Sequence, residues 1–535
     1  MKENRSASVI WGPLLTFTIL SGLPFLLEGF GFMILLAFTP LFCLEDVCRK
    51  GNVKHRGWYY IMAFYLFNIV TTYWIWNISP AGAIAAMTVN VTFMTVVFRA
   101  FTYSRSICER AGRPDSILPY LFFIFLWISW EHVYCIIELS WPWLVLGNAF
   151  ATSPELIQWY DLTGVEGGSL WVLSTSIAAF VAIRELSDGK KRKAQTAAIA
   201  TVAAVLVPSI ISLCKYHCYQ EKGPAVEMAA VQPNIDPLMK YGAAPQSVYD
   251  EHMIWMLDRI VTPRTKYAIT PETFTYDIDL RNPESSSSYR RYSEFLAANK
   301  GLSMILGALT TYRYDDVRKP TPSARKKDGA WFDVFNSAMI IPSECPVHCS
   351  HKSKLVPGVE IVPYQEVLPF LGKICKKFGG SSESYGRSDK MAALKGLDGH
   401  IAAPMICYES VYGDYATGAV RNGADFLVVI TNDGWWGNTH GHKQHFRFAR
   451  LRAIENRRDL IQVANTGISG IINQRGDVLK STAYCVETAF TGDVHTDTKM
   501  TVFSKNGDLI GRYSAVPALF IMLMIISYRT TRKKD

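Results

Sequence analysis

Apolar residues are concentrated in the first 214 positions of the chain and again near its C-terminal end. Long apolar runs alternate there with short polar connections, which predicts membrane-spanning helices because a hydrocarbon core of about 30 Å takes roughly 20 helical residues. The runs cover 8–27, 30–44, 57–78, 81–98, 116–139, 166–184, 195–214 and 511–528. We therefore expect an α-helical bundle of about eight spans, of which the second is short. The first is read as a retained anchor because it has no clear small-x-small cleavage site.

The central part of the chain has a different pattern. From about 226 to 500, short apolar runs of strand length alternate with longer polar or amphipathic stretches, which is typical of an α/β domain. The predicted strands are 266–270, 303–308, 335–341, 401–406, 426–431, 461–464 and 470–473, and the predicted helices are 246–260, 288–299 and 442–457. The predicted organisation is seven spans in 1–214, a linker at 215–225, the α/β domain in 226–500, and a last span with a basic tail in 501–535.

Basic residues mark alternate connections between the predicted spans. Lys and Arg gather at 49–56, 99–113, 190–193 and 529–534, whereas the intervening connections are nearly free of them. Basic connections face the cytoplasm by the positive-inside rule, so the α/β domain is predicted to lie on the outer side. The net charge of +9 is then mostly a signal of orientation, and we expect no nucleic-acid partner.

One cysteine lies where a strand is predicted to end. The apolar run 401–406 leads into Cys407, and the turn-rich segment VYGDY, 411–415, follows shortly after it. Such a position can expose a side chain at the rim of a sheet, as in a nucleophile elbow. The alternative is that Cys407 is a small buried hydrophobe, as most unpaired core cysteines are.

A nucleophilic cysteine needs a base or a cation near it, and an acyl intermediate needs donors for its oxyanion. Two segments provide candidates: YAITPET places Glu272 at a strand end, and HKSKLVPGVE places Lys352, Lys354 and Glu360 in a Pro/Gly loop. Taken singly, each charged residue is more typical of a solvated surface. Taken together with Cys407 in one domain-sized segment, they form a candidate catalytic set.

In the order Glu, Lys, Cys, these residues resemble the catalytic triad of the nitrilase, or carbon-nitrogen hydrolase, superfamily. Further segments resemble the apolipoprotein N-acyltransferases, the membrane-bound branch of that superfamily. They are KSKLVPGVE from Lys352, ICYE from Ile406, TNDGWWG from Thr431, His445 with the basic run 447–458, WPWLVLGN at 141–148 and GVEGG at 164–168. The resemblance implies a four-layer αββα nitrilase-like sandwich over about 226–500, beside the helical bundle.

The resemblance also implies a role for each site residue. Cys407 is the expected nucleophile, Glu272 the general base, and Lys352 the oxyanion donor together with a backbone N–H near Tyr408. The expected supporting residues are Glu360, Tyr408 and Glu409, and Glu409 is a candidate partner of Lys352. The residues expected to contact substrate are Trp435, Trp436 and His445.

The implied reaction transfers an acyl chain from a membrane phospholipid, through a thioester on Cys407, to the α-amino group of the diacylglyceryl-cysteine of a lipoprotein. We expect no cofactor and no metal, since the histidines at 440, 442 and 445 are read as substrate-facing or solvated. The expected protein is a monomer in the bacterial inner membrane, with its catalytic domain in the periplasm. Two alternatives stay open: a membrane-anchored amidase that releases the acid to water, and a non-enzymatic transporter or scaffold.

Other polar positions also stay open. Glu131 and His132 fall in an otherwise apolar span, where an ionisable residue marks either a site or a polar contact between helices. The chain has 11 cysteines, and an exported location would permit Cys345 to pair with Cys349 or Cys375.

Overall fold

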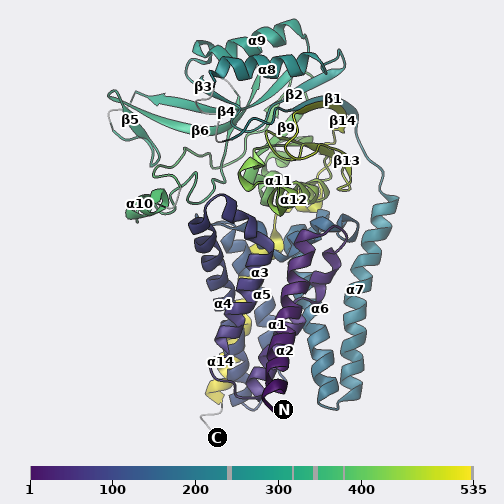
Figure 1. Ribbon diagram of the computed structural model, residues 1–535. Coiled ribbons are helices and arrows are strands. Elements are labelled where there is room, and N and C mark those ends of the chain that lie inside the picture. Colours follow the sequence, from purple (N-terminus) through teal and green to yellow (C-terminus); the bar gives the residue numbers. More distant parts are fainter. Residues whose placement is uncertain (1, 238–243, 316–317, 342–347, 378–379, 532–535) are drawn as a thin grey trace. The chain divides into compact units, whose positions relative to one another are not determined.

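The computed structural model of the chain describes residues 2–237, 244–315, 318–341, 348–377 and 380–531. The chain divides into two compact units (Figure 1). Unit 1 comprises Met1–Trp76, Ala83–Cys218 and Asp508–Asp535, and unit 2 comprises Asn77–Gly82 and Tyr219–Gly507. The basic residues predicted after position 531, and Cys345, lie outside the described residues.

Unit 1 is built from apolar helices. They are α1 (Lys2–Leu26), α2 (Phe38–Lys50), α3 (Gly57–Thr72), α4 (Pro80–Arg110), α5 (Leu118–Tyr134), α6 (Tyr160–Ser187), α7 (Lys191–Cys218) and α14 (Leu509–Thr531). Short 3-10 helices connect them at Gly31–Leu36, Tyr73–Asn77, Pro142–Leu144, Leu146–Thr152 and Pro154–Leu156. The predicted linker at 215–225 is therefore shorter than expected, because α7 continues to Cys218.

Six segments among the described residues are long and apolar enough to cross a membrane. They are Val9–Leu26, Gly31–Lys50, Pro80–Arg110, Tyr160–Ser187, Lys191–Cys218 and Leu509–Tyr528. Helices α3 and α5 have 16 and 17 residues, fewer than the roughly 20 that a full span takes. The chain is a membrane protein, and the predicted count of about eight spans is approximate.

Aromatic rings fill the interior of unit 1. Phe42 of α2 packs against Phe98 and Phe101 of α4, Phe123 of α5 and Phe180 of α6, with ring centroids 5.4 to 6.2 Å apart. These stacked, tilted and edge-on contacts fix how neighbouring helices face one another. One residue of α2 therefore ties together helices that are far apart in the sequence.

The two ionisable residues of α5 make polar contacts inside unit 1. Oε1 of Glu131 accepts hydrogen bonds from Trp127 Nε1 at 3.0 Å and from the Leu146 N–H at 2.9 Å. Nδ1 of His132 lies 2.8 Å from Oδ2 of Asp508, the residue before α14. The sequence left open whether Glu131 and His132 mark a functional site or a polar contact between helices. These hydrogen bonds favour a polar contact between elements of unit 1.

The described residues of unit 2 form two β-sheets. The first has eight strands in the order β14-β1-β2-β4-β6-β5, with β3 paired to β4 and β7 to β6, and the second has six in the order β13-β12-β11-β10-β9-β8. The strands are β1 (Ala225–Gln232), β2 (Thr265–Ile269), β3 (Thr275–Asp279), β4 (Ser303–Tyr314), β5 (Arg325–Lys327), β6 (Ala330–Ile341), β7 (Cys349–His351), β8 (Leu394–Lys395), β9 (Ile401–Ile406), β10 (Phe426–Thr431), β11 (Leu460–Ala464), β12 (Gly470–Ile472), β13 (Val478–Ser481) and β14 (Thr488–His495).

Helices cover the outer faces of both sheets. They are α8 (Gln246–Asp258) and α9 (Ser287–Ala298) on the first sheet, and α11 (Tyr415–Arg421) and α12 (His440–Asn456) on the second. Between the sheets, Met228 and Ile305 of the first share one apolar cluster with Ile406 and Val428 of the second. This is the predicted four-layer αββα sandwich, which the structure confirms. The short helices α10 (Phe370–Lys377) and α13 (Val502–Asn506) complete the unit.

Candidate active site

Cys407 lies at the turn that the sequence predicts. It directly follows β9 and opens a 3-10 helix, Cys407–Val411, and its φ of 51° is in the left-handed region that non-glycine residues rarely adopt. Strained backbone of this kind persists only where the surrounding structure enforces it. The side chain is partly exposed and rests on the core between the sheets. Burial and the nearby Glu272 carboxylate hold the pKa of the Cys407 thiol well above its ordinary value, and the Lys352 ammonium acts in the opposite direction.

Lys352 is buried between two carboxylates. Its Nζ lies 3.0 Å from Oε1 of Glu272 and 2.9 Å from Oε1 of Glu360, and the residue is 1% exposed. Burial by itself lowers the pKa of a lysine, but the two carboxylates hold the pKa of Lys352 well above its ordinary value. Lys352 is therefore an ammonium, and it lies close enough to Cys407 to lower the pKa of the thiol.

Glu272 lies just after β2 in a turn that packs against the first sheet. A Cβ on Gly307 of β4 would come within 2.1 Å of the Pro271 carbonyl oxygen, so the close approach of this turn requires glycine there. The next residue, Thr273, has a φ of 48°, a rare conformation for a β-branched side chain. The strand and the strained turn together fix the carboxylate.

A third polar side chain joins the two carboxylates. Nδ2 of Asn336, on β6, donates to Oε1 of Glu272 at 2.7 Å and to Oε1 of Glu360 at 3.1 Å. The Asn336 carbonyl also accepts the backbone N–H of Lys352 at 2.8 Å. Sequence reasoning missed this residue, because an asparagine inside a strand carries no signal of its own.

Glu409 binds backbone groups instead of the Lys352 ammonium that the sequence suggests as its partner. Its Oε1 accepts the N–H groups of Ser353 at 2.6 Å and Lys354 at 3.2 Å, and its Oε2 accepts that of Ile406 at 2.8 Å. The side chain is fully buried, which raises its pKa to about 7, and these hydrogen bonds oppose the shift. Glu409 thus joins the loop that carries Lys352 to the end of β9.

The aromatic residues predicted near the substrate differ in exposure. Trp435 is 43% exposed, whereas Trp436 is buried and its carbonyl accepts a hydrogen bond from Nδ2 of Asn77 at 2.8 Å. Tyr408 is also buried, with its ring edge-on to Tyr412. Of these four aromatic residues, Trp435 presents the most surface to a ligand.

The three histidines lie in helix α12, which begins at His440, two residues before the helix predicted over 442–457. His445 has no exposed surface, so a contact with substrate does not fit its position. Its Nδ1 lies 3.0 Å from Oδ1 of Asp433, and its Nε2 lies 3.0 Å from the Cys407 carbonyl oxygen and 2.9 Å from Oγ of Ser410. His442 is likewise buried and stacks on Tyr484.

A second residue of α12 holds the same segment. Nη1 of Arg452 donates to the carbonyl oxygens of Ser410 at 3.1 Å and Val411 at 2.9 Å, while its Nε donates to Glu455. Seven residues separate Arg452 from His445, which is about two helical turns, so both lie on one face of the helix. No local pattern in the sequence predicts this contact.

The comparisons with known proteins agree with this geometry. Residues 229–497, half of the chain, match the family model of the carbon-nitrogen hydrolases. The chain belongs to the carbon-nitrogen hydrolase family. Residues 17–178 match a second model, the N-terminal domain of apolipoprotein N-acyltransferase. The resemblance seen in the sequence is thereby confirmed.

Some relatives match this chain over nearly its whole length, through both the helical part and the α/β domain. The chain is similar to the apolipoprotein N-acyltransferase of Chlorobaculum tepidum, with 29% identity over 89% of this chain and 88% of the relative. It is also similar to the apolipoprotein N-acyltransferase of Geobacter metallireducens, with 26% identity over 92% of this chain and 90% of the relative. Among solved structures, Nit3 of Saccharomyces cerevisiae, a nitrilase superfamily member, aligns with 55% of this chain and 94% of its own at 16% identity, with a TM-score of 0.36.

Cys407, Asp433 and His445 could also be read as metal ligands, since their ligand atoms lie within 4.8 Å of one another. Both ring nitrogens of His445 are already in hydrogen bonds with protein groups, which favours a polar network. The expectation of no metal stays a prediction. Cys349 and Cys375 are free thiols here, and Cys345 lies outside the described residues.

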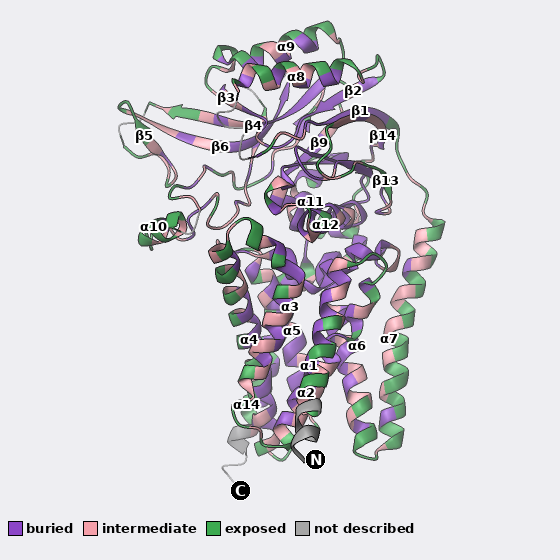
Figure 2. Cartoon of the chain, viewed as in Figure 1, coloured by how far each residue is buried: buried purple, intermediate pink, exposed green. Residues whose placement is uncertain are grey.

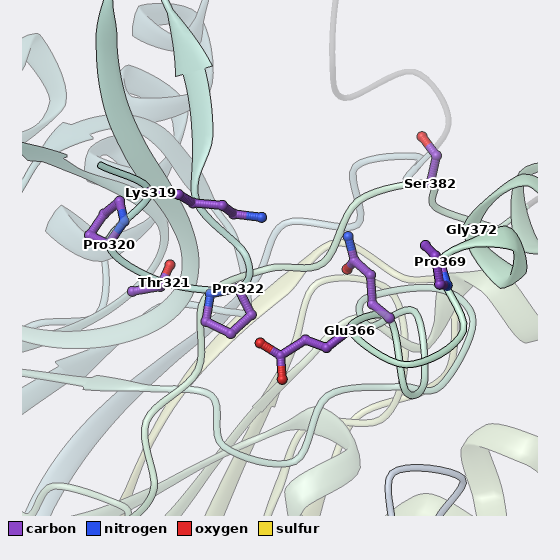
Figure 3. Close-up of a pocket in the computed structure, with 9 residues that line it drawn as sticks. Lys319, Pro320, Thr321, Pro322, Glu366, Pro369, Gly372 and Ser382 are labelled. Carbon is purple, nitrogen blue, oxygen red and sulfur yellow. The ribbon is translucent and has the colours of Figure 1, made fainter. Parts of the chain in front are cut away.

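A cavity of about 480 Å³ lies elsewhere in unit 2 (Figure 3). It is lined by Lys319, Pro320, Thr321, Pro322, Gln365, Glu366, Pro369, Gly372 and Ser382. None of the three candidate catalytic residues is among them, so this cavity is distinct from the site around Cys407.

Proposed function

We propose that this protein transfers an acyl chain from a membrane phospholipid to the α-amino group of the diacylglyceryl-cysteine at the N-terminus of a lipoprotein. Cys407 carries the chain between the two substrates as a thioester. The observation that carries the proposal is the buried Lys352 ammonium, held by Glu272 and Glu360 beside Cys407. The matches of both parts of the chain to apolipoprotein N-acyltransferases support the choice of substrates.

The first half-reaction acylates the cysteine. Glu272 takes the thiol proton of Cys407, and the thiolate attacks the ester carbonyl carbon of the phospholipid. The negative charge that develops on the carbonyl oxygen is stabilised by Lys352 and by a backbone N–H near Tyr408. The ester C–O bond then breaks, and the proton held by Glu272 passes to the leaving lysophospholipid hydroxyl.

The second half-reaction transfers the chain. The α-amino group of the lipoprotein attacks the thioester carbonyl carbon, Glu272 takes a proton from the amine, and the same donors stabilise the oxyanion. The C–S bond breaks, and the proton returns from Glu272 to the Cys407 thiolate. Transfer instead of hydrolysis requires that water be kept from the thioester while the amine arrives.

The helical unit fits this chemistry because donor and acceptor are both membrane-embedded lipids. We propose that the protein acts as a monomer in the bacterial inner membrane, with unit 2 on the periplasmic side, as the distribution of Lys and Arg between connections favours. Trp435, which is exposed, is a proposed substrate contact, with Trp436 beside it.

The decisive experiment incubates the purified full-length protein in lipid nanodiscs with a phospholipid labelled in its acyl chain. A hydroxylamine-sensitive label on Cys407, passed on to a diacylglyceryl peptide with a free amine, is the expected result. Absence of label on Cys407 would refute the mechanism. Release of labelled fatty acid at the same rate with and without the peptide would favour the membrane-anchored amidase.

The orientation has its own test. With the native cysteines replaced, Cys407 included, a cysteine introduced at the exposed Ser285 should react with a membrane-impermeant thiol reagent in intact cells. A cysteine at Ser187, exposed at the end of α6 and next to the basic run 190–193, should react only after lysis. Labelling at Ser187 in intact cells would overturn the proposed orientation.

A further inference from the structure

His445 faces acceptors at both ring nitrogens. Nδ1 lies 3.0 Å from the carboxylate of Asp433, and Nε2 lies 3.0 Å from the carbonyl oxygen of Cys407. Oγ of Ser410 lies 2.9 Å from Nε2 and donates its own proton to the Cys407 carbonyl at 2.8 Å, and a carboxylate and a carbonyl only accept hydrogen bonds. With these partners, both contacts of the ring are hydrogen bonds when each ring nitrogen carries a proton. The Asp433 carboxylate favours that charged ring, since it raises the pKa of His445 above its ordinary value against the opposing effect of burial.

The Cys407 carbonyl receives two hydrogen bonds. Oγ of Ser410 donates to it at 2.8 Å, and Nε2 of His445 donates to it at 3.0 Å while also lying 2.9 Å from the Ser410 hydroxyl. A hydrogen bond from a charged donor is roughly twice as strong as one between neutral groups. This carbonyl belongs to the same peptide group as the Tyr408 N–H.

Hydrogen bonds to the carbonyl of a peptide group strengthen its N–H as a donor, because the group polarises as a unit. The Tyr408 N–H is the backbone group proposed above to stabilise the oxyanion. A cation on the Cys407 carbonyl would thus act on the transition state through the intervening peptide bond, without touching the substrate.

We propose that His445, charged and oriented by Asp433, is a positioning residue that fixes the Cys407–Tyr408 peptide group and strengthens its N–H as an oxyanion donor. This inference rests on the proposed acyl transfer. It assigns His445 a role different from the substrate contact expected from the sequence.

A purely structural role is the alternative, and other contacts already serve that purpose. Arg452 holds the carbonyls of Ser410 and Val411, and Glu409 holds the N–H of Ile406. The segment on either side of Cys407 is therefore anchored without His445. What His445 adds is a charged donor on the carbonyl of the Cys407–Tyr408 peptide group, the group proposed to provide the oxyanion donor.

The test compares two reactions of the same thiol in the full-length protein. Acylation by labelled phospholipid passes through an oxyanion, whereas alkylation by iodoacetamide does not. The variant is His445→Gln combined with Asp433→Asn, which replaces a charged pair by a neutral pair and leaves the net charge near the thiol unchanged. We expect the single-turnover acylation rate to fall about 10-fold, less than the roughly 10²-fold or more for removal of a whole oxyanion donor, while the alkylation rate stays within about 2-fold.

Three results would overturn the inference: unchanged acylation, an equal fall in both reactions, or a fall in alkylation alone. If the double variant does not fold, as judged by thermal unfolding, Asp433→Asn alone decides, because it leaves a neutral imidazole on the carbonyl and should also slow acylation selectively. His442→Gln, which alters a buried histidine on the same helix that stacks on Tyr484, is the matched control and should leave both rates unchanged. Failure of the wild-type protein to acylate Cys407 would instead refute the proposed function.

Discussion

The two units of the molecule both bury apolar side chains, but they differ in the kind of surface that they expose. On α7 of unit 1 the outward residues are apolar, with Ile199 70% and Val202 56% exposed, whereas β10 of unit 2, FLVVIT, is buried along its whole length. Figure 2 shows α7 largely exposed and the strands of both sheets largely buried. An apolar helix surface of this kind is typical of a helix in contact with lipid. One rule, burial of apolar groups away from water, therefore gives both patterns.

Each unit also buries a cluster of charges, and the two clusters differ in their balance. In unit 1, the largely buried members of the cluster are Arg49 and Arg105, which pair with Glu45 and Asp46, two charges against two. In unit 2, Lys352 alone lies between Glu272 and Glu360. A balanced cluster holds helices together, whereas an excess carboxylate beside a thiol can take its proton. The comparison therefore predicts that disrupting the first cluster lowers stability, whereas disrupting the second lowers the rate of acyl transfer as well as stability.

The largest effect is expected at Cys407. Both Cys407→Ala and Cys407→Ser should abolish acyl transfer, because the thioester requires a thiolate. The measurement is transfer of a labelled acyl chain to a diacylglyceryl peptide, with thermal unfolding as the check on folding. Ordinary transfer by Cys407→Ala would disprove the mechanism.

The second-largest effect is expected when the Lys352 ammonium is removed. Lys352→Ala should lower the transfer rate by roughly 10² or more, on the scale of one lost oxyanion donor, and should also lower stability because two buried carboxylates lose their partner. Lys354→Ala is the matched control, since Lys354 lies over the Tyr412 ring, away from the carboxylate pair, and it should keep activity. If Lys354→Ala lost activity and Lys352→Ala kept it, Lys354 and not Lys352 would be the oxyanion donor.

The balanced cluster of unit 1 should respond in stability. Arg105→Met leaves the buried Glu45 and the partly buried Asp46 with fewer partners and should cost about 3–5 kcal/mol, the range for breaking a buried ion pair. Thermal unfolding of the purified protein measures it. Arg291→Ala, which breaks the exposed pair with Glu251 in unit 2, should have little effect. Equal effects of the two variants would contradict the distinction between the clusters.

The smallest effect is expected from single Asp substitutions at exposed valines. They test whether α7 faces lipid and whether the surface of unit 2 faces water. Val202 in α7 and Val486 in unit 2 are both about half exposed. Val202→Asp should disfavour membrane insertion by about 2.5–3.5 kcal/mol, whereas Val486→Asp should change stability by no more than about 0.5 kcal/mol. The yield of folded protein in the membrane and its thermal unfolding provide the measurements. Tolerance of Asp at 202 would indicate that this face of α7 is not in contact with lipid.

Local pattern by itself determined a large part of this protein. The apolar runs predicted the helices, and strands 401–406 and 426–431 have the predicted bounds. The position of Cys407 at a strand end could be derived because a strand and a turn are encoded by adjacent residues. The presence of Glu272 and Lys352 in one site was expected from family resemblance and not from local pattern, since 80 residues separate the two in the sequence.

Tertiary structure alone decided the surroundings of these residues. Strand β14, TAFTGDVH, has a weak apolar pattern, and it forms because it pairs with the whole length of β1. Asn336, Asp433, His445 and Arg452 act on groups brought near them by other strands and helices, and Glu409 binds the backbone of a loop more than 50 residues away. A buried polar side chain takes whichever donors and acceptors the packed elements bring within about 3 Å of it. A short stretch of sequence cannot predict these hydrogen bonds, because the partners are brought together only when the sheets and α12 pack.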